Sequence, residues 1–520
     1  METLLVGVDV GTGSARAGVV TMTGELLGRA EHPIRMLRRS AIEAEHDSTD
    51  IWRAVCRAVR GAVAEANADP SLVYGLAFDA TCSLVLRDEH DRPLRISGDE
   101  PDWDTFVWHD HRAIAEAAEC TATGHRVLDH LGGVMSPEME IPKLMWFKRH
   151  RPEAWNRLRG AYDLADWLAH RATGSGARSV STLATKWSFL AHEADGWPAD
   201  FLAQVGLSDL FEKCGLPKLP IAPGESVGSL TEAAAEELGL TTITQVAAGL
   251  VDAHAGALGV LAPYFDDPID RHLALIAGTS NSILALAPDE RSIRGIWGPS
   301  FGAIVPDLWL SEGGQSAAGA LLDHLIRWHG AGGEPTPDLH AAIVARIGEL
   351  QAETPNLASD LHVVPDFLGN RSPLGDPTAR GMIVGLTLAH DFDSLCRLYW
   401  RAAVGLAVGL RRIVESFSAN GYGATTLHAA GGHTRNPLLL QLYADATGCT
   451  IVEPEGDPVL LGSAMVASVG VKHGSVRAAA RAMQRSGTPR SPNPEKYAAY
   501  DRDYRIMLEL QRQREVLRTF

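Results

Sequence analysis

The N-terminal sequence begins with an apolar stretch, LLVGVDV, which runs through a glycine-rich turn directly into a second apolar stretch, ARAGVVTM. The turn, Gly11-Thr12-Gly13-Ser14, lacks the third glycine of the dinucleotide-binding sequence GxGxxG. A dinucleotide-binding turn must also lead into a helix, whereas this one leads into a strand. The chain contains no GxxxxGK followed by Ser or Thr, so a Walker-type loop is absent. The pattern therefore predicts a β-hairpin with small residues and hydroxyls at its tip.

Such a hairpin can bind phosphate through its backbone amides and the hydroxyls of Thr12 and Ser14, with Arg16 as a nearby cation. The alternative is an ordinary structural hairpin, since glycine turns are common. A second strand-turn-strand unit, HLALIAGTSNSILALA, repeats the form and suggests an internal duplication with a domain start near residue 260. Two facing turns, one in each domain, can hold a nucleotide in a cleft. The second turn consists of Gly278, Thr279 and Ser280.

A third glycine site, Gly431-Gly432, follows the apolar stretch TTLHAA. Asn436 is a suitable N-cap for the following helix, and Pro437 suits the first helical turn. Gly448 suits the C-terminal end of that helix. Paired glycines at a strand end let a flat ligand approach the backbone, although a plain strand-to-helix turn has the same pattern.

Length and charge limit the class of protein. A chain of 520 residues predicts two domains, because single cores stop growing near about 250–300 residues. The formal net charge of −17 argues against nucleic acid and anionic membranes as partners. The six cysteines form no CxxC pair, METLLV carries an acid where a signal peptide is basic, and no apolar run reaches about 18 residues. We therefore expect a cytoplasmic protein that is not bound to membranes.

Several helices are expected from periodicity and capping residues. One spans about residues 50–67, with Ser48, Thr49 or Asp50 as its cap. A long amphipathic helix presents a face that runs from Leu395 to Phe417, with Asp393 or Ser394 as its cap. The region 105–210 is rich in Trp and His and is expected to be an insertion that covers a cleft. The last 27 residues, from Pro494, have a polar helical pattern.

Asp252 lies in GLVDAHAG, at the end of an apolar stretch and before a run of small residues. A carboxylate there can accept a proton from an attacking hydroxyl in phosphoryl transfer, but it can also simply cap a helix. A metal site at His109, Asp110 and His111 is disfavoured, because adjacent side chains of a strand point to opposite faces. Cys82 lacks the spacing of a nucleophilic triad.

DVGTGSARAGV, GLVDAHAG, AGTS and GGHTRNP occur in this order, and together they resemble the FGGY carbohydrate kinases over nearly the whole chain. The resemblance implies an α/β protein with two actin-like, ribonuclease-H-like domains and a catalytic cleft between them. Residues 1–258 would form the N-terminal, sugar-binding domain, and residues 259–520 the C-terminal, ATP-binding domain. It also implies ATP and Mg²⁺ as cofactors, a small sugar as substrate and a homodimer.

The chain is similar in particular to pentulose kinases of the D-ribulokinase type, through FDATCSLV, WHDHR, GGVMSPEMEIPKLMW, TKW, LSEGGQSAAG and PDFLGNRSPL. Thr81-Cys82-Ser83 is the feature that indicates D-ribulose. Glycerol kinases carry an Arg-Glu pair near this position, where this chain has Ala80-Thr81. L-Ribulose, xylulose and pentitols are alternative substrates. A non-catalytic actin-like nucleotide switch is an alternative of another class, but no separate peptide-binding domain is visible after residue 480.

The resemblance also assigns site residues. Asp252 would be the base for the C5 hydroxyl of the sugar, and Asp9 would orient Mg²⁺ through water. The remaining residues fall into three groups. Those at the phosphates would be Gly11, Thr12, Gly13, Ser14, Arg16, Gly278, Thr279 and Ser280. Those at the adenosine would be Gly431, Gly432 and Asn436. Those at the sugar would be Thr81, Cys82, Asp110, Lys186, Asp252 and Glu312.

Overall fold

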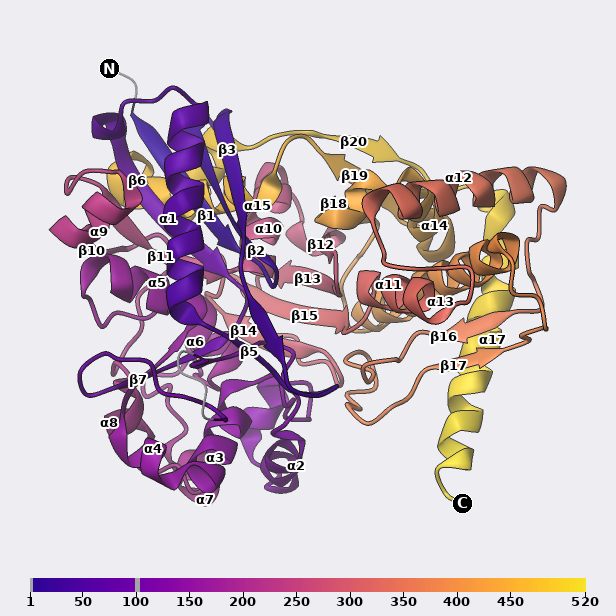
Figure 1. The fold of residues 1–520 in the computed structure, drawn as a ribbon, viewed down its shortest axis with the longest axis horizontal. Coiled ribbons are helices and arrows are strands. Elements are labelled where there is room, and N and C mark those ends of the chain that lie inside the picture. The colour runs from indigo at the N-terminus through magenta and orange to yellow at the C-terminus, as the bar shows by residue number, and fades with distance from the viewer. Residues whose placement is uncertain (1–2, 99–102) are drawn as a thin grey trace.

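The computed structural model of the chain describes residues 3–98 and 103–520 and contains two large mixed sheets that lie side by side along its long axis (Figure 1). The strands of the first, in spatial order, are β10 (Ser226–Ser229), β11 (Gln245–Val251), β6 (Val73–Ala80), β1 (Leu4–Val10), β2 (Ser14–Thr21) and β3 (Leu26–Pro33). Those of the second are β14 (Trp297–Phe301), β15 (Trp309–Gln315), β13 (Asn281–Ala287), β12 (His272–Ala277), β18 (Thr426–Ala430), β19 (Thr450–Pro454) and β20 (Gly487–Arg490).

The two sheets repeat one arrangement, which confirms the predicted two-domain α/β fold. In the first, β3, β2 and β1 are antiparallel neighbours, and β6 and β11 continue the sheet parallel to β1. In the second, β15, β13 and β12 are antiparallel neighbours, and β18 and β19 are parallel to β12. Both predicted hairpin turns are present. Gly11 N–H donates to the Ser14 carbonyl at 3.0 Å, and Gly278 N–H donates to the Ser280 carbonyl at 2.9 Å.

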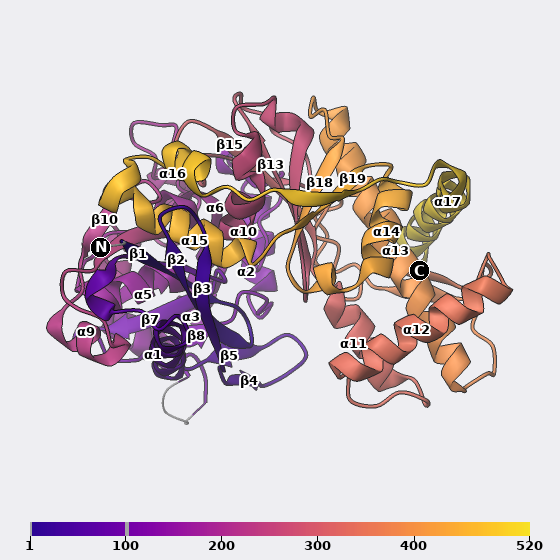
Figure 2. The same ribbon diagram turned by 90° about the horizontal axis from the view of Figure 1, so that it is seen from above.

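Two small-residue helices, α10 (Asp252–Leu261) and α15 (Pro458–Ser468), connect the sheets. Glycines let them pack closely: a Cβ on Gly259 would lie 1.9 Å from the Pro458 carbonyl oxygen, and one on Gly462 would lie 2.0 Å from that of Ala255. Although α15 comes late in the sequence, it packs on β1 and β6 of the first sheet (Figure 2). The predicted division at residue 258 falls inside α10.

A third sheet of five strands combines two strands of the region 105–210, predicted to be an insertion, with three strands that precede it. In spatial order it contains β4 (Met36–Arg38), β5 (Ala44–His46), β8 (Thr105–Phe106), β7 (Leu84–Asp88) and β9 (Leu158–Asp163). Around it lie α2 (Ile114–Ala122), α3 (Glu140–His150), α4 (Pro152–Arg157), α7 (Ala199–Gln204) and α8 (Leu210–Cys214). From the same region, α5 (Leu164–Thr173) packs mainly on β11 and β6 of the first sheet, and α6 (Val180–Lys186) packs on β11 and β14. The apolar core around the third sheet includes Trp297 of β14, so the insertion meets the second sheet.

The capping predictions were partly wrong. Helix α1 (Ser48–Glu65) is capped by Asp47, which accepts from the N–H groups of Thr49 and Asp50, while the Ser48 hydroxyl donates to Asp104. Because the Ser48 hydroxyl is used by Asp104, the cap is Asp47, one residue before the first predicted candidate.

The long helix α13 (Phe392–Ala419) is capped by Asp391, two residues before the predicted cap. In contrast, α14 (Pro437–Thr447) has the predicted Asn436 cap and ends at Gly448 with φ 73°.

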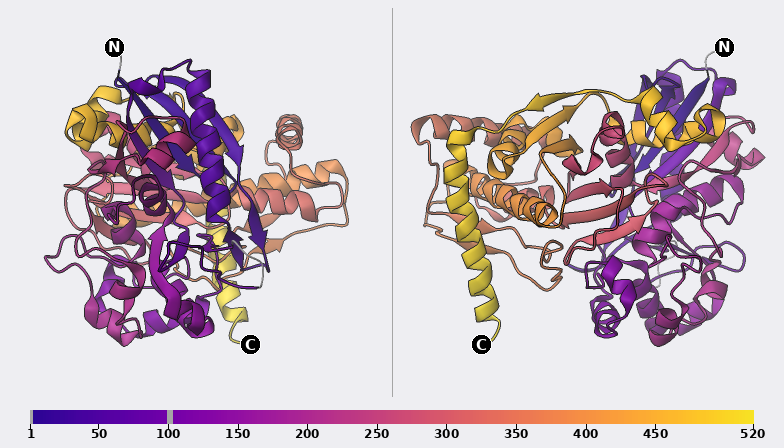
Figure 3. Two further views of the ribbon diagram at one scale, coloured as in Figure 1. Left: turned by 60° about the vertical axis from the view of Figure 1, so that its left-hand side comes forward. Right: turned by 180° about the vertical axis from the view of Figure 1, so that it is seen from behind.

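The C-terminal helix α17 (Pro494–Leu517) confirms the predicted polar helix and runs along the outer edge of the second half of the molecule (Figure 3). Remaining described helices are α9 (Glu232–Leu238), α11 (Gly319–Trp328), α12 (Pro337–Glu353) and α16 (Val476–Met483), with the short strand pair β16 (His362–Val364) and β17 (Met382–Val384). Within the described residues, no single helix is long and apolar enough to cross a membrane, and the one bent pair that passes by composition turns through 109°.

Candidate functional site

The two hairpin turns and Asp252 line one cleft with an open volume of about 930 Å³. The cleft lies between the sheets, and its lining includes segments far apart in the sequence. Of the predicted site residues, it brings together Gly11, Thr12, Arg16, Thr81, Cys82, Lys186, Asp252, Gly278, Thr279, Ser280, Glu312, Gly431 and Gly432. Gly13, Ser14, Asn436, Asp9 and Asp110 are not in its lining.

The phosphate-type turns have open space in front of their backbone. A Cβ on Gly13 or Gly278 would meet nothing within 4 Å, so a ligand can approach both turns closely. The Thr12 hydroxyl accepts a hydrogen bond of 2.9 Å from Trp108 Nε1, which fixes the first turn against the insertion. The Ser14 hydroxyl instead donates to Glu31 at 2.7 Å, which draws this side chain away from the cleft.

Asp252 is the first residue of α10, directly after β11. Its Oδ1 accepts from the N–H of Ala253 at 2.7 Å, and the N-cap position belongs to Val251. The side chain is partly exposed to the cleft. Burial in a low-dielectric wall, with Asp9 as a neighbouring negative charge, raises the pKa of Asp252 to about 7. A carboxylate with this pKa can accept a proton near neutral pH.

Behind Asp252 lie two further carboxylates, Asp9 at the end of β1 and Asp79 on β6. Burial raises the pKa of both, and Asp9 also raises that of Asp79. Asp9 pairs with Arg16, its cross-strand neighbour, and Asp79 accepts from Ser463 of α15. Asp79 Oδ1 is buried without a hydrogen-bond partner. A buried group of acids, paired with one cation at Arg16, therefore lies next to this wall of the cleft without lining it.

The opposite part of the cleft contains a buried ion group. Glu312 of β15 lies 3.6 Å from Lys186 Nζ, 3.8 Å from an Arg371 guanidinium nitrogen and 3.9 Å from His254 Nε2. Lys186, at the end of α6, lies with Nζ 4.5 Å from the ring centroid of Trp297. The charges of Lys186 and Arg371 hold the pKa of Glu312 well below its usual value, despite its burial. Such convergent donors and acceptors suit a polyhydroxylated ligand.

Cys82 borders this ion group, and its buried thiol is poorly suited to act as a nucleophile. Burial raises the pKa of its thiol to about 12, so the thiolate is scarce at neutral pH. This agrees with the sequence argument against a covalent role. Thr81, beside it, shares a 3.1 Å hydroxyl contact with Ser83.

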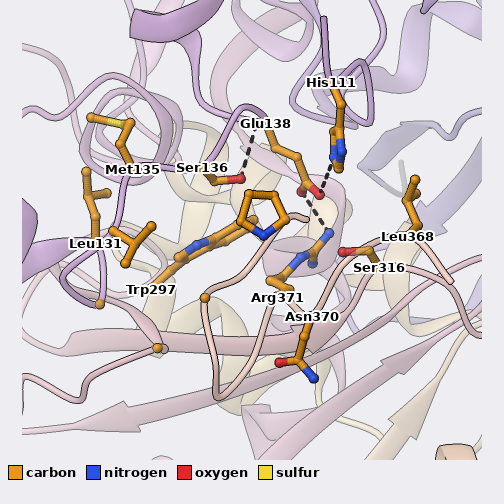
Figure 4. Close-up of a pocket in the computed structure, with 15 residues that line it drawn as sticks. His111, Leu131, Met135, Ser136, Glu138, Trp297, Ser316, Leu368, Asn370 and Arg371 are labelled. Carbon is orange, nitrogen blue, oxygen red and sulfur yellow. Dashed lines mark hydrogen bonds and ion pairs between the residues drawn. The ribbon is translucent and has the colours of Figure 1, made fainter. Parts of the chain in front are cut away.

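Among the cleft residues that were not predicted, four have aromatic or charged side chains: Trp108, Glu138, Trp297 and Arg371. Arg371 Nη2 donates to Glu138 Oε2 at 2.8 Å, and its guanidinium lies 4.6 Å from the ring of Trp297. Figure 4 shows Glu138 between Arg371 and His111, where the three form one wall of an adjoining pocket of about 420 Å³. Three of the four lie in sequence stretches noted above, WHDHR, GGVMSPEMEIPKLMW and PDFLGNRSPL, which was the available signal.

The structure does not support Asp110 as a sugar contact. Asp110 is fully buried, and its carboxylate accepts from the Ala44 N–H at 2.8 Å and from the Arg112 guanidinium at 2.7 Å. Asn436 is likewise engaged, because its side chain caps α14. No cluster of three metal-ligating side chains exists among residues 3–98 and 103–520, a range that contains His109 and His111.

Comparisons with known proteins agree with this geometry. Residues 4–259 match the N-terminal domain of the FGGY family of carbohydrate kinases, and residues 273–471 match its C-terminal domain. An FGGY carbohydrate kinase domain-containing protein from Danio rerio is 40% identical over 536 residues, with 98% of each chain covered. A D-ribulokinase from Saccharomyces cerevisiae is 35% identical, with 89% of this chain and 71% of that protein covered.

Among solved structures, a xylulose kinase from Rhodospirillum rubrum has the same fold, with a TM-score of 0.78 over 99% of both chains at 23% identity. Two sheets of repeated topology, facing hairpin turns and a matching sequence over both halves lead to one conclusion. The chain belongs to the FGGY family of carbohydrate kinases.

Proposed function

We propose that the protein transfers the γ-phosphoryl group of ATP to a ketopentose, converting D-ribulose to D-ribulose 5-phosphate. The observation that carries the proposal is the position of Asp252, in one cleft with two open phosphate-type turns and with the ion group of Lys186 and Glu312. The 35% identity to a D-ribulokinase supports the choice of sugar.

In this mechanism Lys186, Glu312 and Arg371 bind the sugar hydroxyls, and the two hairpin turns bind the phosphates. The C5 hydroxyl oxygen forms the new bond to the γ-phosphorus as the bond from that phosphorus to ADP breaks. Asp252 accepts the hydroxyl proton and later releases it to solvent. Domain closure would exclude water from the cleft and so limit ATP hydrolysis.

The acidic end of the cleft fits a Mg²⁺ ion held through water. Asp9 and Asp252 each raise the pKa of Asp79, and an Asp79 oxygen is buried without a partner, so a divalent cation nearby would favour the ionised forms of these acids. Mg²⁺ keeps several of its waters, so it needs few direct protein ligands. When bound, the ion would neutralise charge on the phosphates.

The pH profile tests the role of Asp252. Because burial raises its pKa to about 7, we expect kcat/KM for the sugar to fall below that pH, by about tenfold per unit at the acid end. The rate falls on the acid side because only the ionised carboxylate of Asp252 can accept the proton. The same raised pKa means that folding favours the protonated form, so this group contributes less to stability as pH rises from 3.8 toward 7. A kcat/KM that stays constant through this range would contradict the assignment.

The substrate proposal is tested by ADP release, measured over D-ribulose, L-ribulose, xylulose and pentitols. We expect D-ribulose to give the highest kcat/KM, since the buried polar groups of the site should reject sugars that leave them unpaired. D-Ribulose outside the best substrates would refute the choice of sugar while leaving the kinase assignment intact. ATP hydrolysis that no sugar changes would instead favour a nucleotide switch.

Location and assembly stay predictions. We propose a cytoplasmic location, supported by the six cysteines, all in the described ranges and all free thiols. The homodimer implied by the family resemblance can be tested by sedimentation.

A further inference from the structure

The segment between β16 and β17, residues 365–381, delivers Arg371 to the cleft and is here called the Arg371 loop. Arg371 is almost fully buried, and it faces Glu138 at 2.8 Å and Glu312 at 3.8 Å. Its guanidinium also lies 5.6 Å from the ring of Trp108. The guanidinium thus touches both the insertion and the ion group that we assign to the sugar.

The C-terminal helix α17 anchors the Arg371 loop. At the N-terminal end of the loop, Asp366 accepts from Gln511 Nε2 at 3.1 Å and from Arg514 Nη1 at 2.6 Å. Asp366 and Arg514 are each 5% exposed, so this is a buried ion pair. The other oxygen of Asp366 accepts from Asn370 Nδ2 at 2.9 Å, directly beside Arg371.

The far end of the loop is held by the same helix. Arg518 lies 2.5 Å from the Asp376 carboxylate and donates to the Thr378 hydroxyl at 2.7 Å, and Arg514 donates to the Arg380 carbonyl at 3.0 Å. Backbone hydrogen bonds between Asn370 and Asp376 close the segment that carries Arg371. Helix α17 therefore forms hydrogen bonds with the loop on both sides of Arg371.

We propose that α17 is a positioning element for the sugar site, acting through the Asp366–Arg514 pair to hold Arg371 against Glu138 and Glu312. The inference rests on the proposed function, because it takes Arg371 to be part of the sugar site. The match to the family's C-terminal domain ends at residue 471, before α17 begins. Without the anchor, the loop can withdraw its arginine and leave two buried acids with fewer partners, which weakens sugar binding.

The chain offers a matched control for this anchor. Asp503 of α17 forms a second buried pair, with Arg401 of α13, at 2.6 Å. Among the described residues, that pair has no hydrogen bond or ion pair to the Arg371 loop, and Arg401 donates instead to the Leu361 carbonyl, directly before β16. Asp366→Asn and Asp503→Asn each remove one carboxylate charge beside a buried arginine. We expect Asp366→Asn to raise the KM of the best sugar about tenfold, with the KM of ATP changed less than about twofold. Asp503→Asn should lower the melting temperature similarly but change the sugar KM less than about twofold.

Two further measurements separate the outcomes. Trypsin should cleave after Arg371 faster in Asp366→Asn than in Asp503→Asn or wild type, a readout by mass spectrometry that needs no sugar. Arg514→Lys should recover part of the sugar affinity that Arg514→Gln loses. If Asp366→Asn does not fold, Arg518→Gln provides a second variant. Arg518 is half-exposed, so its replacement should leave the fold intact while removing the contact to Asp376 at the far end of the loop, and it should give the same faster cleavage. Equal sugar KM and equal cleavage in the Asp366 and Asp503 variants would overturn the inference, whereas a wild type that phosphorylates no sugar would overturn only the proposed function.

Discussion

Asp252→Asn is expected to lower kcat by about 10³- to 10⁴-fold while nucleotide binding stays near wild type. The amide cannot take up the proton that the sugar hydroxyl loses, so the attacking oxygen stays weakly nucleophilic. The fold should tolerate the change, because an amide oxygen can still accept from the N–H of Ala253, as Oδ1 does now. Removing a carboxylate whose pKa is raised also removes an unfavourable charge.

Single-turnover kinetics and calorimetric titration with ATP measure the two effects separately. Asp252→Glu is the matched control, because it keeps the carboxylate but moves it by one methylene, and it should retain more activity than the amide. Turnover near wild type in Asp252→Asn would show that another group takes the proton. Loss of ATP binding together with turnover would indicate that this residue shapes the nucleotide site instead.

Local sequence signals predicted the parts of the fold that depend on local physics. Glycine turns between apolar stretches predicted both hairpins, because a turn that leads into a strand must reverse the chain. Asn436-Pro437 and Gly448 predicted both ends of α14, because the Asn side chain accepts from a free N–H of the first turn and glycine adopts the left-handed conformation at the end. The sequence did not reveal that α15 packs on the first sheet. Its stretch PVLLGSAMVAS is apolar on every side, which predicts burial without saying against which neighbour.

The candidate site was predictable where a residue follows directly from its own strand or turn, as Asp252 and Gly278 do. It was not predictable where a side chain comes from a loop and meets partners far away in the sequence. Arg371 is the example, because Glu312 and Glu138 lie 59 and 233 residues before it. Asp110 was predicted as a sugar contact, yet it does not line the cleft. Asp110 lies two residues after Trp108, which lines the cleft, but its carboxylate accepts hydrogen bonds from Arg112 and from the backbone N–H of Ala44.

Glu312→Gln should produce the second large effect, a rise of about 100-fold in sugar KM together with a loss of about 3–5 kcal/mol of stability. Glu312 is the shared acid of Lys186, Arg371 and His254, and all four side chains are more than nine-tenths buried. Glutamine keeps the shape but removes the charge, so two buried cations lose a common counter-ion. A sugar bound there would meet a site whose positive groups repel one another.

A double-mutant cycle with Lys186→Met isolates this electrostatic part. The double variant should be less destabilised than the sum of the two single changes. Without Lys186, the Glu312→Gln variant no longer contains a buried lysine that lacks its counter-ion. Acid titration gives an independent check. The pKa of Glu312 lies well below 4.5 in the folded protein, so its contribution to stability is present above pH 4.5 and is lost as the pH falls toward that lower pKa. Wild type should lose this contribution on acidification and Glu312→Gln should not; additive energies and identical acid profiles would refute the shared-acid role.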